Sequence, residues 1–152
     1  LVRPAVSQHA MALLFAADLR GARDIVFAAV AQGGYSLEWA APELHGDQEL
    51  VLIAVAQHGN YMEFATPELQ GDRDFVRKAL AKNSMALRWV APQLQCDQEI
   101  VLAAVAKNGM ALQFAAAELR SDRAVALAAV TQIGSALQYV AVCYRWHTRG
   151  KA

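Results

Sequence analysis

Residues 46–70 read GDQELVLIAVAQHGNYMEFATPELQ, and the chain carries this 25-residue pattern five times. The copies occupy residues 21–45, 46–70, 71–95, 96–120 and 121–145, and residues 1–20 form the back part of a sixth copy that is one residue short. A fixed period of this length is typical of a stacked array in which each unit packs mainly on its neighbours. The period therefore predicts a single array over 1–145, followed by a tail at 146–152 that leaves the pattern.

Each copy opens with the signs of a helix start. Asp47 precedes an apolar-periodic run, and Asp72, Asp97 and Asp122 stand at the same place, with Ala22 as the exception. An aspartate before such a run is typical of an N-cap, whose carboxylate accepts hydrogen bonds from free backbone N–H groups. Apolar residues at i, i+1, i+4 and i+5 then predict one buried helical face, formed in this copy by Leu50, Val51, Ala54 and Val55.

The rest of the copy predicts two shorter helical pieces. A glycine is expected to end the first helix in left-handed geometry at Gly34, Gly59, Gly109 and Gly134, and Asn83 is expected to take that conformation beside Ser84. A leucine or methionine followed by an aromatic residue two positions later predicts a second helix. Pro42, Pro67 and Pro92 should each begin a final short turn. The predicted fold is all-α, an α-solenoid of about six short helix-turn-helix repeats.

The pattern Asp-x-x-x-Val-x-x-Ala-Val-x-x-x-Gly-x-x-Leu-x-x-Ala-x-Pro-x-Leu, which residues 97–119 follow closely except for Ala117 in place of Pro, resembles a tandem repeat family known as a domain of unknown function. The family is common in microalgae and other protists and occurs in some bacteria, including intracellular pathogens. It has no general enzymatic role. The resemblance therefore implies a helical, interaction-mediating module from an alga, with an intracellular and organellar location such as the chloroplast.

Composition and charge narrow the partner classes. Lys plus Arg and Asp plus Glu both number 14, so the chain lacks the basic excess on which nucleic-acid binders rely. The uncharged residues 124–144 follow the repeat register, which explains them better than a membrane span does. Cys96 and Cys143 lie nearly two units apart, so we expect both to be free thiols in a reducing compartment. The chain opens inside a repeat without an initiator Met, which suggests a processed or truncated piece.

The sequence predicts no catalytic, cofactor or metal site. Capping accounts for the periodic aspartates, and no residue spacing indicates a nucleophile with its base or a phosphate-binding glycine loop. The only spacing that fits a metal half-site is that of Cys143 and His147, and surface positions are expected for His9, His45, His58 and His147. The chain is expected not to be an enzyme and to take no cofactor or small-molecule substrate. Packing between repeats explains the aromatic series better than base stacking does: Trp39, Phe64, Trp89, Phe114 and Tyr139.

The outward positions of the first helix carry the strongest hint of a binding surface. They are mostly apolar, and one copy has two cations instead: Phe27-Ala28, Leu52-Ile53, Arg77-Lys78, Leu102-Ala103 and Leu127-Ala128. One interpretation is that this face packs on the second-helix layer, with the cations reaching solvent on aliphatic stems. The other is an exposed apolar stripe at which Arg77 or Lys78 meets an acidic group of a protein partner. Asp74 could instead hold Lys78 by an i,i+4 pair.

The tail is a second candidate surface, because Arg145, Trp146 and Arg149 combine residue types that interfaces favour; a disordered end is the alternative. Taken together, the sequence predicts a non-catalytic protein–protein interaction scaffold. It would be an accessory or linker subunit of a larger complex, such as a photosystem–antenna assembly or an organelle ribosome. The alternatives are an RNA-binding helical repeat, which a basic concave face would reveal, and a regulatory repeat module of a larger enzyme.

Overall fold

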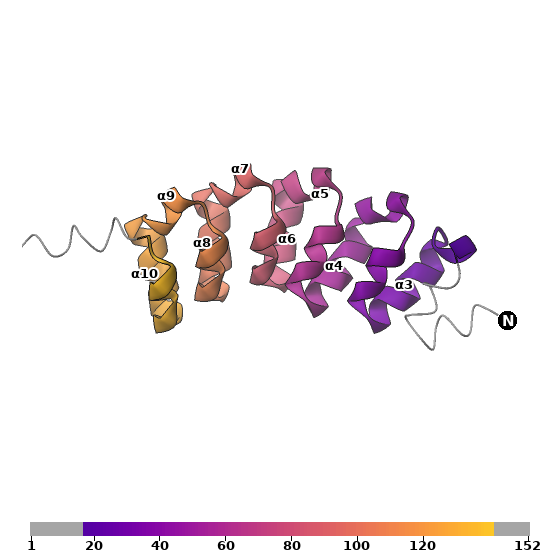
Figure 1. Ribbon diagram of the computed structural model, residues 1–152, viewed down its shortest axis with the longest axis horizontal. Coiled ribbons are helices and arrows are strands. Elements are labelled where there is room, and N and C mark those ends of the chain that lie inside the picture. Colours follow the sequence, from indigo (N-terminus) through magenta and orange to yellow (C-terminus); the bar gives the residue numbers. More distant parts are fainter. Residues whose placement is uncertain (1–16, 142–152) are drawn as a thin grey trace, which may run out of the picture.

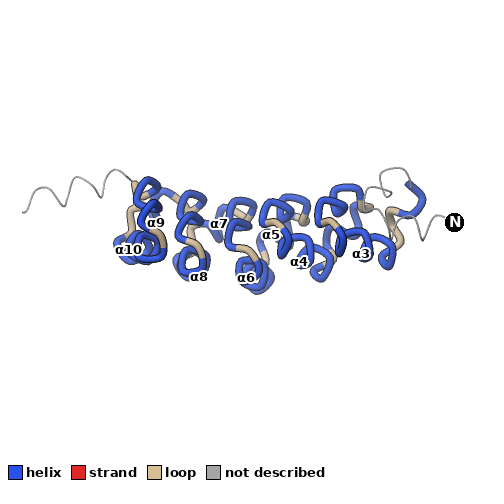
Figure 2. Tube along the Cα trace, turned by 90° about the horizontal axis from the view of Figure 1, so that it is seen from below, coloured by secondary structure: helices blue, strands red, loops and turns tan. Residues whose placement is uncertain are grey.

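The computed structural model describes residues 17–141, so most of the partial copy and the tail lie outside the described residues. Figure 1 shows the repeats following one another along a single axis, with α3 near one end and α10 at the other. Each of the four repeats within residues 21–120 contains a ten-residue α helix, a six-residue 3₁₀ helix and a short third helix, and the first two recur in residues 121–141. In Figure 2 the long α helices form one row and the shorter segments form a second. The prediction of an all-α repeat array is confirmed.

The element bounds follow the 25-residue period. The α helices are α3 (Arg23–Gln32), α4 (Gln48–Gln57), α6 (Arg73–Lys82), α8 (Gln98–Lys107) and α10 (Arg123–Gln132). The six-residue 3₁₀ helices are η2 (Gly34–Trp39), η4 (Gly59–Phe64), η5 (Ser84–Trp89), η6 (Gly109–Phe114) and η7 (Gly134–Tyr139). The short third helices are η1 (Ala17–Leu19), η3 (Pro42–Gly46), α5 (Pro67–Gly71), α7 (Pro92–Gln95) and α9 (Ala117–Arg120), of which η1 and η3 are also 3₁₀. The predicted second helix is thus 3₁₀, and its six residues lie between two extended cap residues.

The α helices begin as predicted. The Asp47 carboxylate accepts from the backbone N–H groups of Glu49 and Leu50, at 3.0 and 3.2 Å. Asp72, Asp97 and Asp122 cap their helices in the same way, whereas Ala22 makes no side-chain cap bond. Each cap satisfies backbone donors that would otherwise have no partner, which contributes about 1 kcal/mol per helix.

The prediction of left-handed glycine caps is wrong. No described residue has a positive φ, and the C-cap of α6 is Asn83 in extended geometry, with φ −147°. The glycines instead begin the 3₁₀ helices, and at Gly59 and Gly109 the backbone of the following repeat comes too close for a side chain. A Cβ on Gly59 would lie 2.7 Å from the backbone nitrogen of Ala86. Asn83 does not relieve strain; its side-chain oxygen accepts from the N–H of Met85 at 3.1 Å.

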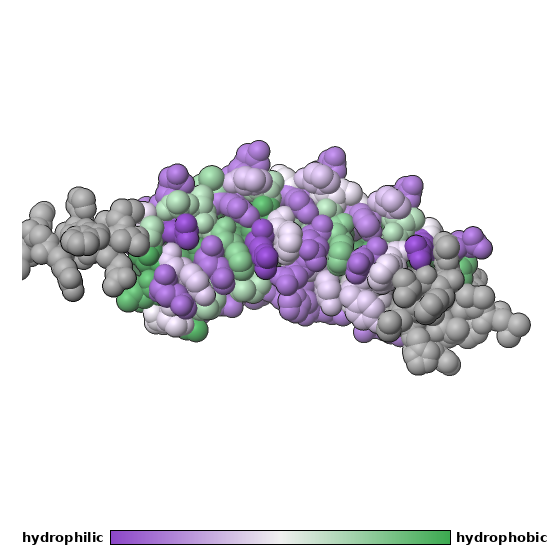
Figure 3. Space-filling view, viewed as in Figure 1, coloured by the Kyte–Doolittle hydropathy of each residue, from purple (hydrophilic) through white to green (hydrophobic). Residues whose placement is uncertain are grey.

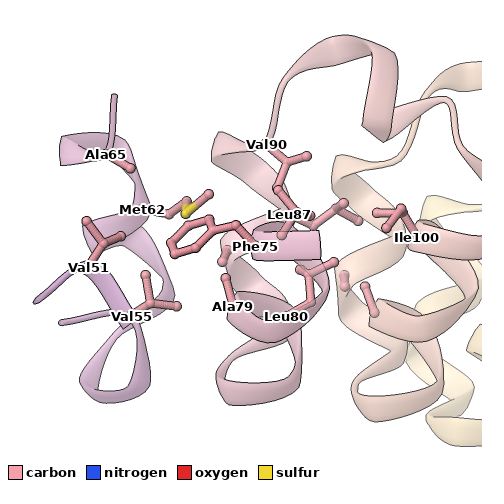
Figure 4. Close-up of a cluster of buried hydrophobic side chains, with 14 of the residues drawn as sticks. Val51, Val55, Met62, Ala65, Phe75, Ala79, Leu80, Leu87, Val90 and Ile100 are labelled. Atoms are coloured by element: carbon pink, nitrogen blue, oxygen red, sulfur yellow. The ribbon is translucent and has the colours of Figure 1, made fainter. Parts of the chain in front are cut away.

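The core runs the length of the array between the two rows. The predicted face of α4 is fully buried at Leu50, Val51, Ala54 and Val55. Figure 4 shows that the packing crosses repeat boundaries, since Phe75 of α6 points toward Met62 and Val55 of the preceding repeat. A repeat therefore buries its apolar face only by stacking on its neighbours, which is why helices this short are stable here.

One backbone hydrogen bond ties each short third helix to the repeat before it. The donor is the residue before the Pro position and the acceptor is the last carbonyl of the preceding repeat. The bonds are Ala41 to Arg20 at 2.9 Å, Thr66 to His45 at 3.2 Å, Ala91 to Gln70 at 2.9 Å, Ala116 to Gln95 at 3.1 Å and Ala141 to Arg120 at 3.2 Å. This ladder fixes the register of successive repeats independently of their side chains.

Candidate functional site: an apolar groove on the outer face of α4

The predicted outward residues of the α helices lie at the surface to different degrees. Phe27, Leu52, Ile53 and Leu102 are half-buried and pack against the core, so for these the interpretation as a packing face holds in part. Arg77 and Lys78 are exposed, and so is Leu127 at the end of the array. Arg145, Trp146 and Arg149 lie outside the described residues. Partner binding by these residues stays a prediction.

Two of the predicted residues line a groove. Leu52 and Ile53 lie with Ala56 along the outer face of α4, and the hollow above them has a volume of about 620 Å³. Gln48 and Glu49 line it at the start of the helix and Gln57 at its end, while Lys82 reaches in from α6. The groove is therefore apolar along its floor, with a carboxylate and an ammonium group among its lining residues. Glu49 is partly neutralised, because its carboxylate lies 2.7 Å from the Arg23 guanidinium.

Lys82 is in the groove because it does not make the contact that its counterparts make. Gln57 donates to the carbonyl of Val30 at 2.7 Å and accepts from the N–H of Gly34 at 2.7 Å, which ties α4 to the end of α3. The Lys107 ammonium donates to the carbonyl of Ala81, and Gln132 donates to that of Ala106 at 3.2 Å. Within residues 17–141 the Lys82 side chain has no such bond, so its charge remains available to a ligand. Sequence reasoning missed Lys82, and the residue type gave no signal, because Lys107 stands at the same repeat position and does make the contact.

Ion pairs join every second boundary between repeats. Arg23 contacts Asp47 at 2.6 Å and Glu49 at 2.7 Å, and Arg73 contacts the equivalent Asp97 at 3.2 Å and Glu99 at 2.7 Å. Gln48 replaces the arginine at the boundary between residues 46–70 and 71–95, where the described part of the chain has no ion pair and where the groove lies. Arg77 is 3.7 Å from Glu99, whereas no ion pair joins Asp74 to Lys78. Lys78 and Lys82 are therefore the free cations of α6 in the described structure.

The Asp47–Arg23 pair predicts a pH effect. The hydrogen bond from Arg23 holds the pKa of Asp47 below its ordinary value of 3.8; partial desolvation opposes this shift and the N–H groups of Leu50 and Glu49 reinforce it. A lowered folded-state pKa adds stability that is fully present above 3.8 and is lost as the pH falls through the folded-state pKa. Arg23→Gln should therefore lower the free energy of unfolding at pH 7, and this difference from wild type should shrink as the pH falls below 3.8. Urea midpoints at several pH values, with an NMR titration of the Asp47 carboxyl carbon, measure both effects. Arg123→Gln is the control, and equal Asp47 titrations in all three chains would contradict the prediction.

The aromatic residues, histidines and cysteines considered above either pack in the array, lie at its surface or fall outside the described residues. The five aromatic residues of the series are half-buried against the core, as packing between repeats predicts: Trp39, Phe64, Trp89, Phe114 and Tyr139. The prediction of a surface position is wrong for His45, which is half-buried with Nε2 2.9 Å from the carbonyl oxygen of Leu37. His58 is exposed and Cys96 is an exposed free thiol. His9, Cys143 and His147 lie outside the described residues. Across residues 17–141 no group of three or more His, Cys, Asp or Glu is placed to hold a metal ion.

None of the helices within residues 17–141 is long and apolar enough to cross a membrane. No curated protein and no solved structure matches the chain. The family model described as "Domain of unknown function (DUF4116)" matches residues 47–95 and again 97–142, which together make up more than half of the chain. Each match begins at a repeat with Asp-Gln-Glu at its helix start and spans two 25-residue units, so it follows the same alternation as the ion pairs. The chain therefore belongs to the DUF4116 family, a tandem helical repeat.

Proposed function

We propose that this chain is a non-catalytic scaffold that binds another protein along the outer face of its α helices, as an accessory or linker subunit of a larger assembly. The groove over Leu52 and Ile53 is the observation that supports this best. Apolar surface that is hollowed and rimmed by polar groups is typical of sites that receive a partner's side chains. An organellar complex of an alga, as the resemblance to the repeat family implies, is part of the same proposal.

The groove indicates the chemistry of the partner. Its floor fits a leucine- or phenylalanine-sized side chain, and Lys82 fits a carboxylate a few residues away on the same partner segment. Lys78 lies one turn earlier on α6, so a second acidic group could follow the first along a helix. An amphipathic segment with alternating apolar and acidic positions meets both requirements. A nucleic acid does not, because the groove floor is apolar and the two free cations of α6 are too few for a phosphate-tracking surface.

Charge reversal at the groove tests the proposal. The full chain is used to capture its partner from the native source, the bound protein is identified by mass spectrometry, and its Kd is measured with purified components. Lys82→Glu should weaken binding about tenfold, because it places a like charge against the partner's carboxylate. Arg77→Glu combined with Lys78→Glu should weaken binding as well. Lys82 is exposed and makes no ion pair within residues 17–141, so circular dichroism and the melting temperature of Lys82→Glu should stay unchanged.

Arg88→Glu is the matched control, since it makes the same charge change in the same repeat but on the 3₁₀ row, where Arg88 stacks on Trp89. If Lys82→Glu and Arg88→Glu weaken partner binding equally, the partner does not bind in the groove and the proposal is contradicted. Recovery of RNA that nuclease treatment releases, in place of a protein, would favour the RNA-binding alternative.

A further inference from the structure

The end of the array at residues 121–141 lacks the cover that every earlier repeat has. Leu137 is 57% exposed, whereas the residues at the same repeat position are completely buried: Leu37, Met62, Leu87 and Leu112. Leu127 is 58% exposed. A Cβ on Gly134 would meet nothing within 4 Å, although its counterpart Gly109 is crowded by the backbone of the repeat that follows it. The repeat that follows covers the position of Leu137 completely in the earlier repeats, whereas it covers that of Leu127 only in part at Phe27, Leu52 and Leu102.

Leu127 and Leu137 belong to one surface. They line a hollow of about 280 Å³ together with half-buried and buried neighbours, and its walls are apolar apart from one arginine: Arg123, Ala126, Leu127, Val130, Leu137 and Val140. Figure 3 shows hydrophobic residues gathered at the end of the array that carries α10. We call these six residues the end face. The end face has the composition of a boundary between two repeats, because the equivalent residues of the earlier repeats lie at such boundaries.

The internal boundaries show what fits such a face. Arg23 and Arg73 occupy the repeat position of Arg123, and each holds an Asp and a Glu that open the next α helix two residues apart. Arg123 makes no ion pair within the described part of the chain, and it borders the apolar hollow. The end face is therefore complemented by an α helix that begins with Asp-x-Glu. Its two carboxylates would pair with Arg123, and the helix would cover Leu127 and Leu137.

Residues 146–152, which follow in register, do not supply this group, because His147 and Arg149 stand at the Asp and Glu positions and would set an arginine against Arg123. The repeat starts of a second copy are a poor match too, because Ala22 stands at the Asp position of one and Ala124 at the Glu position of another. The Asp-x-Glu starts at residues 47–49 and 97–99 are already held by Arg23 and Arg73. We propose that the end face binds a helical repeat of a different protein, whose first α helix begins with Asp-x-Glu.

A grafted repeat tests this fit at high effective concentration. Residues 146–152 are replaced by a second copy of residues 96–120, which places its Asp-x-Glu in register after Arg145. Amide hydrogen exchange of α10 should slow about tenfold relative to a chain that ends at residue 145, because the added repeat buries Leu137. Introducing D97N and E99Q in the grafted copy alone keeps a capping side chain and removes the negative charge. These substitutions should reduce the protection of α10 from exchange. Arg123→Glu should have the same effect in the grafted chain and none in the chain that ends at 145.

The results separate the possible occupants. Unchanged exchange of α10 in the grafted chain would overturn the proposal, as would equal protection by the charged and neutral grafts. Sedimentation velocity of the full native chain should show a monomer. A reversible dimer that Leu137→Arg dissociates would identify a second copy as the occupant and would overturn the choice of a different protein.

Discussion

Gly109→Ala is expected to lower the free energy of unfolding by about 3 kcal/mol, although it adds a single methyl group. The added Cβ would overlap the carbonyl oxygen of Ala129 and would lie 2.8 Å from Cγ2 of Ile133 and 3.1 Å from the carbonyl carbon of Ala129. A side chain could rotate away, but the backbone of α10 can yield only if the whole helix moves off η6. Close-packed interiors do not absorb such a shift cheaply. Urea denaturation followed by circular dichroism measures the loss.

Gly134→Ala is the matched control at the same repeat position. A Cβ there meets nothing within 4 Å, and no described glycine has a positive φ, so alanine fits the existing backbone. The substitution should be neutral or should stabilise the chain by about 0.5 kcal/mol, because alanine restricts the unfolded state. An equal loss of stability in the two variants would contradict the prediction. It would mean that glycine is required for its backbone conformation and not because the next repeat excludes a side chain.

The recurring glycines could be located from the sequence, but their structural role could not be predicted from it. The period identifies the positions, but a left-handed cap and a close approach both leave a recurring glycine, and only the spatial neighbour distinguishes them. That neighbour lies about 20 residues later in the chain, beyond any local pattern. The buried face of α4 could be predicted in full, because Leu50, Val51, Ala54 and Val55 follow from the geometry of one helix.

The groove over α4 likewise combines residues that the pattern of one helix predicts with a residue that only the packing of two helices brings there. Leu52 and Ile53 are apolar at outward positions, which a helical period reveals. Lys82 joins them only because α6 stacks on α4 without the side-chain bond that Gln57 makes to α3. The open end face could not be predicted from Leu137 itself, because the same residue type at the same position is completely buried in other repeats.

Phe75→Ala should have the largest effect of any truncation in the chain, about 4 kcal/mol. Phe75 is 1% exposed and has the largest side chain among the fully buried residues. It lies at the boundary between residues 46–70 and 71–95, which lacks an arginine pair and carries the groove. Figure 4 shows its ring directed at the preceding repeat, so its removal leaves a cavity between two repeats and not within one. The stability of this boundary therefore depends on apolar packing by Phe75 to a greater extent than that of the ion-paired boundaries.

Loss of this packing should change the cooperativity of unfolding as well as the midpoint. A repeat array unfolds as one unit only while each boundary is more favourable than the separation of its two sides. Phe75→Ala should therefore broaden the urea transition and lower its m-value, since the repeats on either side of the boundary would unfold in separate steps. Phe75→Leu restores the residue type found at Leu50 and should cost less than about 1.5 kcal/mol with a normal m-value. A sharp single transition in Phe75→Ala, with an unchanged m-value, would show that the backbone ladder and the remaining apolar contacts couple the two halves without the ring.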